Sequence, residues 1–335
     1  MASVPSEEEE VAAQNQQQQT EITNVGELHF ASSRIKELHD AIATVVHGKS
    51  DVIRDFLTAI VAGGSVLLED LPGVGKTTLA KTFANLVDLR FQRLQCTPDL
   101  MPSDVSGFSV YDSREGTFTF RPGPIFSNVL LIDEINRASP RTQSALLEAM
   151  AEGQVTIEGK CRQLERPFLV IATQNPTGFK GTYPLPEAQL DRFLFLLEMN
   201  YPDRESEIEM LYGDEPTNDM QPILDGKGLE AIQLMAANVE VHRDLADYII
   251  WITQLTRKDT RLRIGCSPRG SKMLFRAAQA AALVAGRDFV LPDDVQHVAP
   301  LALAHRVSSK RDRMEAHCSK RQVIEDLVSQ IPVPA

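Results

Sequence analysis

The stretch from Ser65 to Thr78, SVLLEDLPGVGKTT, restricts this chain to a small set of folds. Its apolar start predicts a buried strand, Gly73 and Gly75 predict a turn, and Lys76 opens a helix-forming segment. Backbone N–H groups and the helix dipole at such a helix N-terminus both favour an anion. Lys76 adds a point charge for the outer phosphates, and Thr77 offers a hydroxyl to Mg²⁺. The sequence therefore predicts a phosphate-binding loop.

This loop departs from the usual spacing at one position. The pattern G-x-x-x-x-G-K-[ST] places glycine at position 70, where this chain has Asp70. Gly73 and Gly75 still supply a permissive backbone beside the phosphates, whereas a fortuitous glycine-rich turn is the alternative interpretation. The candidate nucleotide-contacting residues of the loop are Pro72, Gly73, Val74, Gly75, Lys76, Thr77 and Thr78.

Composition narrows the function classes further. The 335 residues are 43% hydrophobic and 24% charged, which is typical of a globular protein. A net charge of −12 argues against a surface devoted to nucleic acid. The four cysteines are far apart and form no C-x-x-C pair, so we expect free thiols in a reducing compartment. The acidic N-terminus and the lack of a long apolar run predict a cytoplasmic protein without a membrane segment.

The pattern of strands and helices predicts two folded parts. Solid apolar runs at 129–132, 168–172 and 193–197 alternate with helical patterns, which indicates an α/β layer fold with a parallel sheet. After about residue 201 the periodicity is helical and no further strand pattern follows, which predicts an all-α domain. We therefore expect a disordered acidic and Gln-rich tail over 1–24, an α/β domain over 25–200 and a helical lid over 201–335.

Two hairpins interrupt the predicted α/β domain. Extended pieces at 107–111 and 117–120 flank a turn, so a first hairpin is expected over about 104–123. A second is expected over about 153–167. The alternation places Phe118 and Phe120 on one face, so the first hairpin must contact another surface.

Asp133 and Glu134 follow the apolar run 129–132 directly. Carboxylates at the C-terminal end of a buried strand lie in the crevice where open α/β sheets bind ligands. Asp133 is suited to hold Mg²⁺ through water, and Glu134 to orient or deprotonate an attacking water. Two solvated carboxylates would explain neither their adjacency nor the second matching element in the phosphate loop.

Three other residues have both a functional and a structural interpretation. Asn175 ends the strand at 168–172, where a neutral amide can hold the attacking water, although Asn-Pro is also a common turn. Val46 and Gly48 belong to an apolar turn upstream of the phosphate loop, which could contact the base or simply connect two helices.

Two arginines are further candidates. Ser267 and Pro268 are typical of an N-cap and a first helical residue, so Arg269 is expected in the first turn of a helix. A cation is unfavourable there because it opposes the helix dipole, which indicates that an anion binds nearby. Arg192 follows Asp191, and either forms a surface ion pair with it or reaches a phosphate on a neighbouring subunit as an arginine finger.

The order of these motifs resembles one family. EDLPGVGKT, TPDLMPSD, RPGPIF, LLIDEINRA, ALLEAM, ATQNP, YPLPEAQLDRF and GCSPRG are similar to the MoxR family of AAA+ ATPases, over about 25–306. RTQSALLEAM and TYPLPEAQLDRF make the resemblance specific, because ATP binding as such does not require them. Asp70, unusual for a phosphate-binding loop in general, also resembles the residue usual at this position in the family.

The resemblance implies a role for each candidate residue. Lys76 and Thr77 would form Walker A with ATP and Mg²⁺, and Asp133 and Glu134 would form Walker B. Further roles would be sensor 1 for Asn175, the trans-acting finger for Arg192, sensor 2 for Arg269 and a switch of the catalytic glutamate for Gln95. The family also implies a hexamer, a chaperone-like activity and a partner with a von Willebrand factor A domain.

Three functions remain as hypotheses at this point. An ATP-driven protein remodeller fits a complete hydrolysis set with two hairpins that hydrolysis does not need. A nucleic-acid-remodelling motor is the alternative, because Lys160, Arg162 and Arg166 make the second hairpin basic, while the first carries mixed charges. A regulatory nucleotide switch that hydrolyses little ATP is the third.

Overall fold

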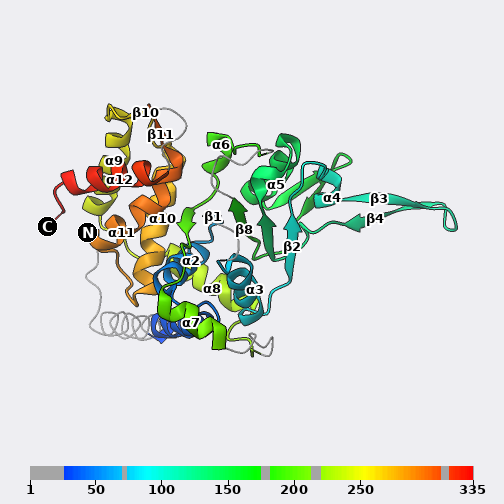
Figure 1. The fold of residues 1–335 in the computed structure, drawn as a ribbon, viewed down its shortest axis with the longest axis horizontal. Coiled ribbons are helices and arrows are strands. Elements are labelled where there is room, and N and C mark those ends of the chain that lie inside the picture. Colours follow the sequence, from blue (N-terminus) through cyan, green and yellow to red (C-terminus); the bar gives the residue numbers. More distant parts are fainter. Residues whose placement is uncertain (1–25, 70–73, 175–181, 213–219, 311–316, 335) are drawn as a thin grey trace, which may run out of the picture.

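The structure is a computed structural model that describes residues 26–69, 74–174, 182–212, 220–310 and 317–334. The predicted tail over 1–24 lies outside the described residues. Figure 1 shows the central sheet with the C-terminal helices gathered on one side and a long hairpin projecting from the other.

The central sheet has five parallel strands in the order β2-β5-β8-β1-β9. The inner strands are buried along their length because helices cover both faces, which explains their solid apolar runs. The strands are β1 (Val66–Glu69), β2 (Phe91–Gln95), β5 (Val129–Asp133), β8 (Leu169–Gln174) and β9 (Phe195–Glu198).

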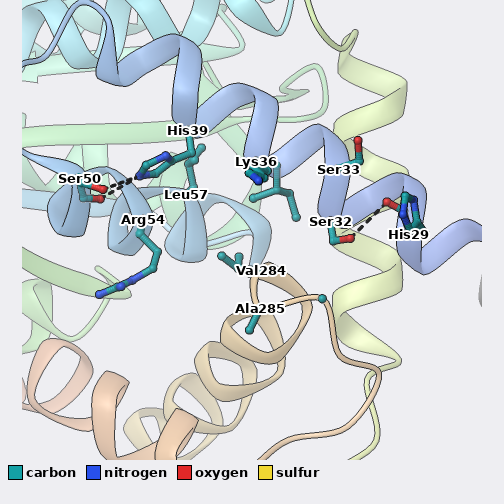
Figure 2. A pocket seen from close by; sticks show the side chains of 12 residues that line it. His29, Ser32, Ser33, Lys36, His39, Ser50, Arg54, Leu57, Val284 and Ala285 are labelled. Carbon is teal, nitrogen blue, oxygen red and sulfur yellow. Dashed lines mark hydrogen bonds between the residues drawn. The ribbon is translucent and has the colours of Figure 1, made fainter.

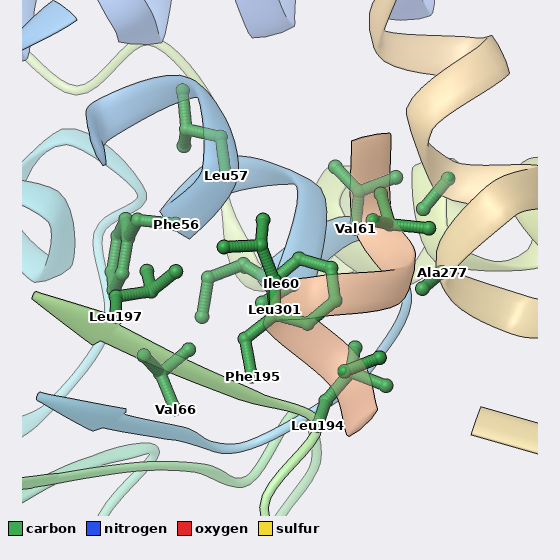
Figure 3. Packing of buried hydrophobic residues seen from close by; sticks show 14 of the residues in the cluster. Phe56, Leu57, Ile60, Val61, Val66, Leu194, Phe195, Leu197, Ala277 and Leu301 are labelled. Atoms are coloured by element: carbon green, nitrogen blue, oxygen red, sulfur yellow. The ribbon is translucent and has the colours of Figure 1, made fainter. Parts of the chain in front are cut away.

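The two faces of the sheet carry separate apolar clusters. On one face, a first helix over 26–43, α2 (Ser50–Val61), α3 (Lys76–Leu86) and the lid helices share one cluster. Figure 3 shows Phe56 and Ile60 of α2 lying over Val66, Phe195 and Leu197 of the sheet. On the other face lie α4 (Pro102–Ser106) and α5 (Pro140–Glu152). Ser139 caps α5 by accepting the N–H of Thr142 at 3.3 Å, as its sequence position predicts.

Both expected hairpins are present. The first pairs β3 (Gly107–Asp112) with β4 (Thr117–Pro122), and the second pairs β6 (Gln154–Ile157) with β7 (Lys160–Gln163). The first projects far from the body of the protein (Figure 1). Phe120 packs near its root against Phe126, whereas Phe118 pairs with Tyr111 further out and is 73% exposed.

The two hairpins contact each other. Glu158, at the turn of the second, accepts the hydroxyl of Ser109 of the first at 2.7 Å. The guanidinium of Arg162 lies 3.7 Å from the ring centre of Phe120, an attractive cation–π arrangement. The second hairpin therefore supports the first at its root.

The C-terminal part is helical, with one small departure from expectation. β10 (Leu262–Ile264) and β11 (Ser308–Ser309) form a two-stranded antiparallel sheet, where no strand was expected. These strands are too short to produce an alternating pattern. The helices are α7 (Arg204–Tyr212), α8 (Gly226–Ala237), α9 (Arg243–Lys258), α10 (Pro268–Val284), α11 (Pro292–Leu303) and α12 (His317–Gln330).

The predicted α/β fold with a parallel sheet and a helical lid is thus confirmed. The predicted boundary near residue 200 falls between β9 and α7. Throughout the described ranges, none of the helices has both the length and the apolar character that crossing a membrane requires.

Candidate functional site

The described part of the phosphate loop begins at Val74. Gly75 has φ +91° and precedes α3, whose first residue is Lys76. That left-handed conformation strongly favours glycine, which explains this residue at the turn. Lys76 is buried, while Thr77 and Thr78 are half-buried in the first turn of α3. Pro72 and Gly73 lie outside the described residues.

Asp133 and Glu134 lie where β5 ends, and Thr173 of the neighbouring β8 fixes both. The Thr173 hydroxyl donates to Asp133 Oδ1 at 2.7 Å and accepts the backbone N–H of Glu134 at 2.9 Å. Glu134 has φ +56°, an uncommon conformation for a residue other than glycine. A strained backbone held by a specific hydrogen bond is typical of functional sites.

The Glu134 carboxylate contacts two donors. Gln95 Nε2 donates to Glu134 Oε2 at 2.9 Å, and Arg137 Nε lies 3.2 Å from the same oxygen. Gln95 and Asp133 are partners in the β2–β5 register, so the sheet itself brings the Gln95 side chain to Glu134. Gln95, the candidate switch residue, therefore contacts the candidate catalytic glutamate, and its switching role stays a prediction.

Asp133 also has a cationic neighbour. Arg93 Nη2 lies 2.6 Å from Asp133 Oδ2, and Arg93 is half-exposed on β2. The carboxylate of Asp133 and the hydroxyl of Thr77 are the oxygen ligands that Mg²⁺ prefers, and α3 packs against β5. The residues present therefore fit a magnesium ion, and Arg93 would compete with it for Asp133.

Cys96 directly follows Gln95, and the negative charge of this site affects the pKa of its thiol. Its thiol is buried, and burial raises its pKa to about 12, with the carboxylates of Asp133 and Glu134 adding to the rise. Both effects disfavour the thiolate, so Cys96 is an inert part of the core.

Val46 and Gly48 line a cavity of about 510 Å³. Met199 lines the same cavity, and its methyl group is 4.0 Å from the place a Cβ of Gly75 would occupy, so the cavity adjoins the phosphate loop. The lid contributes Leu301 and Arg321 to its wall. This placement favours the base-contacting interpretation of the turn.

A different cavity of about 650 Å³ lies between the first helix, α2 and the end of α10 (Figure 2). Its wall includes His39, hydrogen-bonded to Ser50, and the cations Lys36 and Arg54. It is lined by none of the predicted site residues. Of the predicted nucleotide-contacting residues, Val46 and Gly48 line the cavity beside the phosphate loop, and their contact with a nucleotide stays a prediction.

Arg269 occupies the second position of α10, as predicted. Ser267 caps the helix by accepting the N–H of Gly270 at 3.2 Å, with Pro268 as the first helical residue. The Arg269 side chain is exposed and forms no hydrogen bond or ion pair with another residue of the described ranges. Asn175 lies outside those ranges, directly after Gln174 at the end of β8.

Arg192 does not pair with Asp191. Its Nη1 donates to the backbone oxygen of Leu147 in α5, and the side chain is half-buried. Asp191 instead forms an ion pair with Arg306 at 3.0 Å. The structure therefore removes the surface-pair interpretation and ties Arg192 to α5.

Sequence reasoning missed several residues of the site. Thr173 and Arg93 are polar residues at or near the ends of neighbouring strands. Glu69 and Gln174 are in similar positions and form a hydrogen bond of 3.0 Å between β1 and β8. A polar residue at a strand end could have marked each of them as a candidate, but the contact partner of each depends on the strand order.

The comparisons with known proteins agree with this arrangement. Residues 65–195 match the model of the ATPase family associated with various cellular activities (AAA), and residues 254–327 match the AAA lid domain. Chaperone MoxR1 of Mycobacterium tuberculosis is 41% identical over 304 residues, which are 88% of this chain and 80% of that protein. This chain belongs to the MoxR family of AAA ATPases. The nucleotide-binding character of that family agrees with the loop before α3.

Two other curated proteins match the same share of this chain. Protein MoxR of Methylorubrum extorquens is 30% identical, over 88% of this chain and 93% of that protein. The uncharacterized protein YeaC of Bacillus subtilis is 46% identical, over 88% and 92%. A crystal structure from Cytophaga hutchinsonii, described as that of an ATPase, superimposes with a TM-score of 0.84 at 38% identity, covering 92% of this chain and 98% of that one.

Proposed function

We propose that this protein is a Mg²⁺-dependent ATPase that acts as a chaperone-like remodeller of partner proteins in a nucleotide-dependent hexameric ring. The observation that carries the proposal is the Glu134 carboxylate beside Asp133, held by Gln95 at the end of β5. It is the arrangement that a general base for an attacking water requires. The name of the relative, Chaperone MoxR1, supports the remodelling activity.

The site has roles for each proposed residue. Gly75, Lys76 and the first turn of α3 bind the phosphates, while Pro72 and Gly73 would precede them in the loop. Thr77 and Asp133 hold Mg²⁺, which neutralises charge on the phosphates. Glu134 and Asn175 position the attacking water, and Arg269 of the lid contacts the phosphates from the same chain.

A neighbouring subunit completes the site in this proposal. Arg192 lies on the loop before β9 and would reach the phosphates bound by an adjacent copy. Mixing Lys76→Ala with Arg192→Ala protein tests this, because each pure variant should be inactive and the mixture should regain part of the activity. No recovery in assembled mixtures would contradict a role of Arg192 in trans.

The hairpins favour a protein client over nucleic acid. Tyr111 and Phe118 expose apolar rings on the projecting hairpin, which suits an apolar peptide segment. Arg162, one of three cations on the second hairpin, stacks on Phe120 and supports the first hairpin. Salt-dependent DNA binding that stimulates ATP hydrolysis would favour the nucleic-acid motor instead.

The deciding experiment measures ATP turnover and client capture together. Glu134→Gln should lower turnover by about 10²-fold or more while ATP still binds, because only the base is lost. That variant, kept with ATP in cell extract, should retain the client, for which a von Willebrand factor A-domain protein of the cytoplasm is the first candidate. A wild-type protein without measurable turnover would support a nucleotide switch.

A further inference from the structure

The loop that carries Arg192 rests on the lid. It begins with α6 (Glu187–Leu190) and ends at Leu194. Glu187 contacts Arg263 of β10 at 3.1 Å and also accepts the hydroxyl of Ser308 of β11. Asp191 contacts both Arg306 and Ser267. Every one of these partners belongs to the lid, at least 76 residues later in the chain.

Arg306 provides most of this support. Its side chain is 1% exposed and lies in η2 (Ala304–Arg306). Its guanidinium donates to the backbone oxygens of Leu194 at 3.0 Å and Asp191 at 3.2 Å, and also to that of Phe193. A planar fork of five N–H donors can hold several acceptors at once, which an ammonium cannot do in this geometry. Arg306 therefore fixes the backbone on both sides of Arg192.

Asp191 balances the buried charge of Arg306 and also reaches α10. Its Oδ1 accepts from Arg306 Nε at 3.0 Å, and its Oδ2 accepts the Ser267 hydroxyl at 3.1 Å. A buried cation is strongly destabilising without such a partner. Asp191 directly precedes Arg192 in the sequence and contacts Ser267, the N-cap of α10, two residues before Arg269. It therefore joins the loop of Arg192 to the start of the helix that carries Arg269.

The chain leaves room for this arrangement at Gly270. A Cβ at Gly270 would lie 3.1 Å from Cδ of Arg306 and 2.2 Å from Sγ of Cys266. The contact with Cys266 is too short for any side chain, so this position requires glycine, and the contact with Arg306 shows that its side chain packs closely against the first turn of α10.

We propose that Arg306 and Asp191 are positioning residues through which the lid of one subunit sets the place of the Arg192 that this subunit presents to its neighbour. This inference rests on the proposed role of Arg192 in trans. Through Arg306 and Asp191, a change in the angle of the lid alters the place of Arg192 and so reaches the next site along the ring.

The first test follows amide hydrogen exchange of residues 187–194, which needs no ATPase activity. The N–H groups of Arg192, Phe193 and Leu194 are all hydrogen-bonded in the structure, so their exchange is protected. Asp191→Asn should speed their exchange about tenfold or more, because Arg306 loses its charged partner. Unchanged exchange in this segment would overturn the proposal.

Two further variants show whether an effect is specific to the contact between Asp191 and Arg306. Arg287→Met removes another ion pair of the lid, to Asp294 at 2.6 Å, and should leave residues 187–194 unchanged. If Asp191→Asn does not fold, Arg306→Lys keeps a cation but loses the fork, and the same acceleration is expected. Equal acceleration in Arg287→Met would show a loosened lid and would overturn the specific role of Arg306.

The second test uses mixed subunits. Ser267 still caps α10 through Gly270 when Asp191 is replaced, so Arg269 keeps its place and the subunit's own site stays complete. Asp191→Asn should therefore behave as Arg192→Ala does: mixing it with Lys76→Ala should restore activity, whereas mixing it with Arg192→Ala should not. Recovery in both mixtures, or in neither, would overturn the proposal.

A positive control separates this inference from the proposed function. If Lys76→Ala and Arg192→Ala fail to complement each other, the role of Arg192 in trans is wrong. The exchange experiment then still decides whether Arg306 and Asp191 hold the loop.

Discussion

Gln95 and Glu134 are joined by a hydrogen bond of 2.9 Å across the ends of two neighbouring strands. Gln95 comes from the edge strand β2, and Glu134 follows β5. The contact fixes the direction of the carboxylate and occupies its Oε2, so this oxygen is less available to a water molecule. An event that moves the edge strand would therefore alter the reactivity of Glu134.

Removing this contact should raise basal turnover. We expect Gln95→Ala to increase kcat for ATP by about 2- to 10-fold, since a hydrogen bond to a charged group contributes roughly 1 kcal/mol or more. Gln92→Ala is the control, because Gln92 points to the other face of β2. Steady-state assays of both variants decide the matter, and an unchanged or lower kcat in Gln95→Ala would contradict a restraining role.

Arg93 should weaken magnesium binding in the resting site. Its pair with Asp133 at 2.6 Å is half-exposed, so it contributes about 1 kcal/mol at most. We expect Arg93→Met to lower the Mg²⁺ concentration for half-maximal activity by about 2- to 5-fold. Arg90→Met removes the exposed pair with Glu165 just before β2 and should leave this concentration unchanged. The same result for both variants would rule out competition at Asp133.

Gly48 should tolerate no side chain. It has φ +68°, and a Cβ there would lie 2.4 Å from the hydroxyl oxygen of Ser206 in α7. Gly63 has the same φ of +68°, but its nearest neighbour would be 4.0 Å away. Gly48→Ala should therefore destabilise the protein by about 1–2 kcal/mol more than Gly63→Ala. Both substitutions strain the backbone at positive φ, but only the one at position 48 also brings a methyl group against Ser206. Denaturant unfolding measures the difference, and equal losses would contradict the contact with α7.

Three of the four cysteines, Cys96, Cys161 and Cys266, should react with iodoacetamide in a fixed order relative to one another. Cys161 is exposed, whereas burial raises the pKa of Cys266 to about 11 and that of Cys96 to about 12. At pH 8 roughly one Cys96 thiol in ten thousand is a thiolate, and this fraction grows as the pH rises. Peptide mapping should show Cys161 labelled first and Cys96 last, with the three reacting alike in denaturant. Early labelling of Cys96 in the native protein would place it outside the core.

The main elements could be predicted because local signals determined them. The apolar run 129–132 predicted a strand buried on both faces, and Ser139 and Ser267 predicted the first turns of α5 and α10. Asp133 and Glu134 followed from their position after a buried strand. These features depend on residues close in sequence, so no knowledge of the tertiary structure was needed.

Contacts that depend on strand order or on the lid could not be predicted. The roles of Thr173 and Arg93 require knowing that β8 and β2 flank β5. The pairing of Asp191 with Arg306 joins residues 115 positions apart, and the sequence offered Arg192 as the nearer partner. The role of Asn175 stays a prediction.

The joined hairpins have a mechanical consequence. Six residues in each of β3 and β4 make an arm about 20 Å long, at roughly 3.3 Å per residue. The arm is braced near its root, where Glu158 holds Ser109 and Arg162 covers Phe120. A rotation of about 15° at Gly107 would carry Tyr111, four residues further along β3, through about 3–4 Å, close to the advance of one residue along an extended polypeptide. In the proposed remodelling activity, the arm would act as a lever that converts a small tilt of the domain into a step along a bound chain.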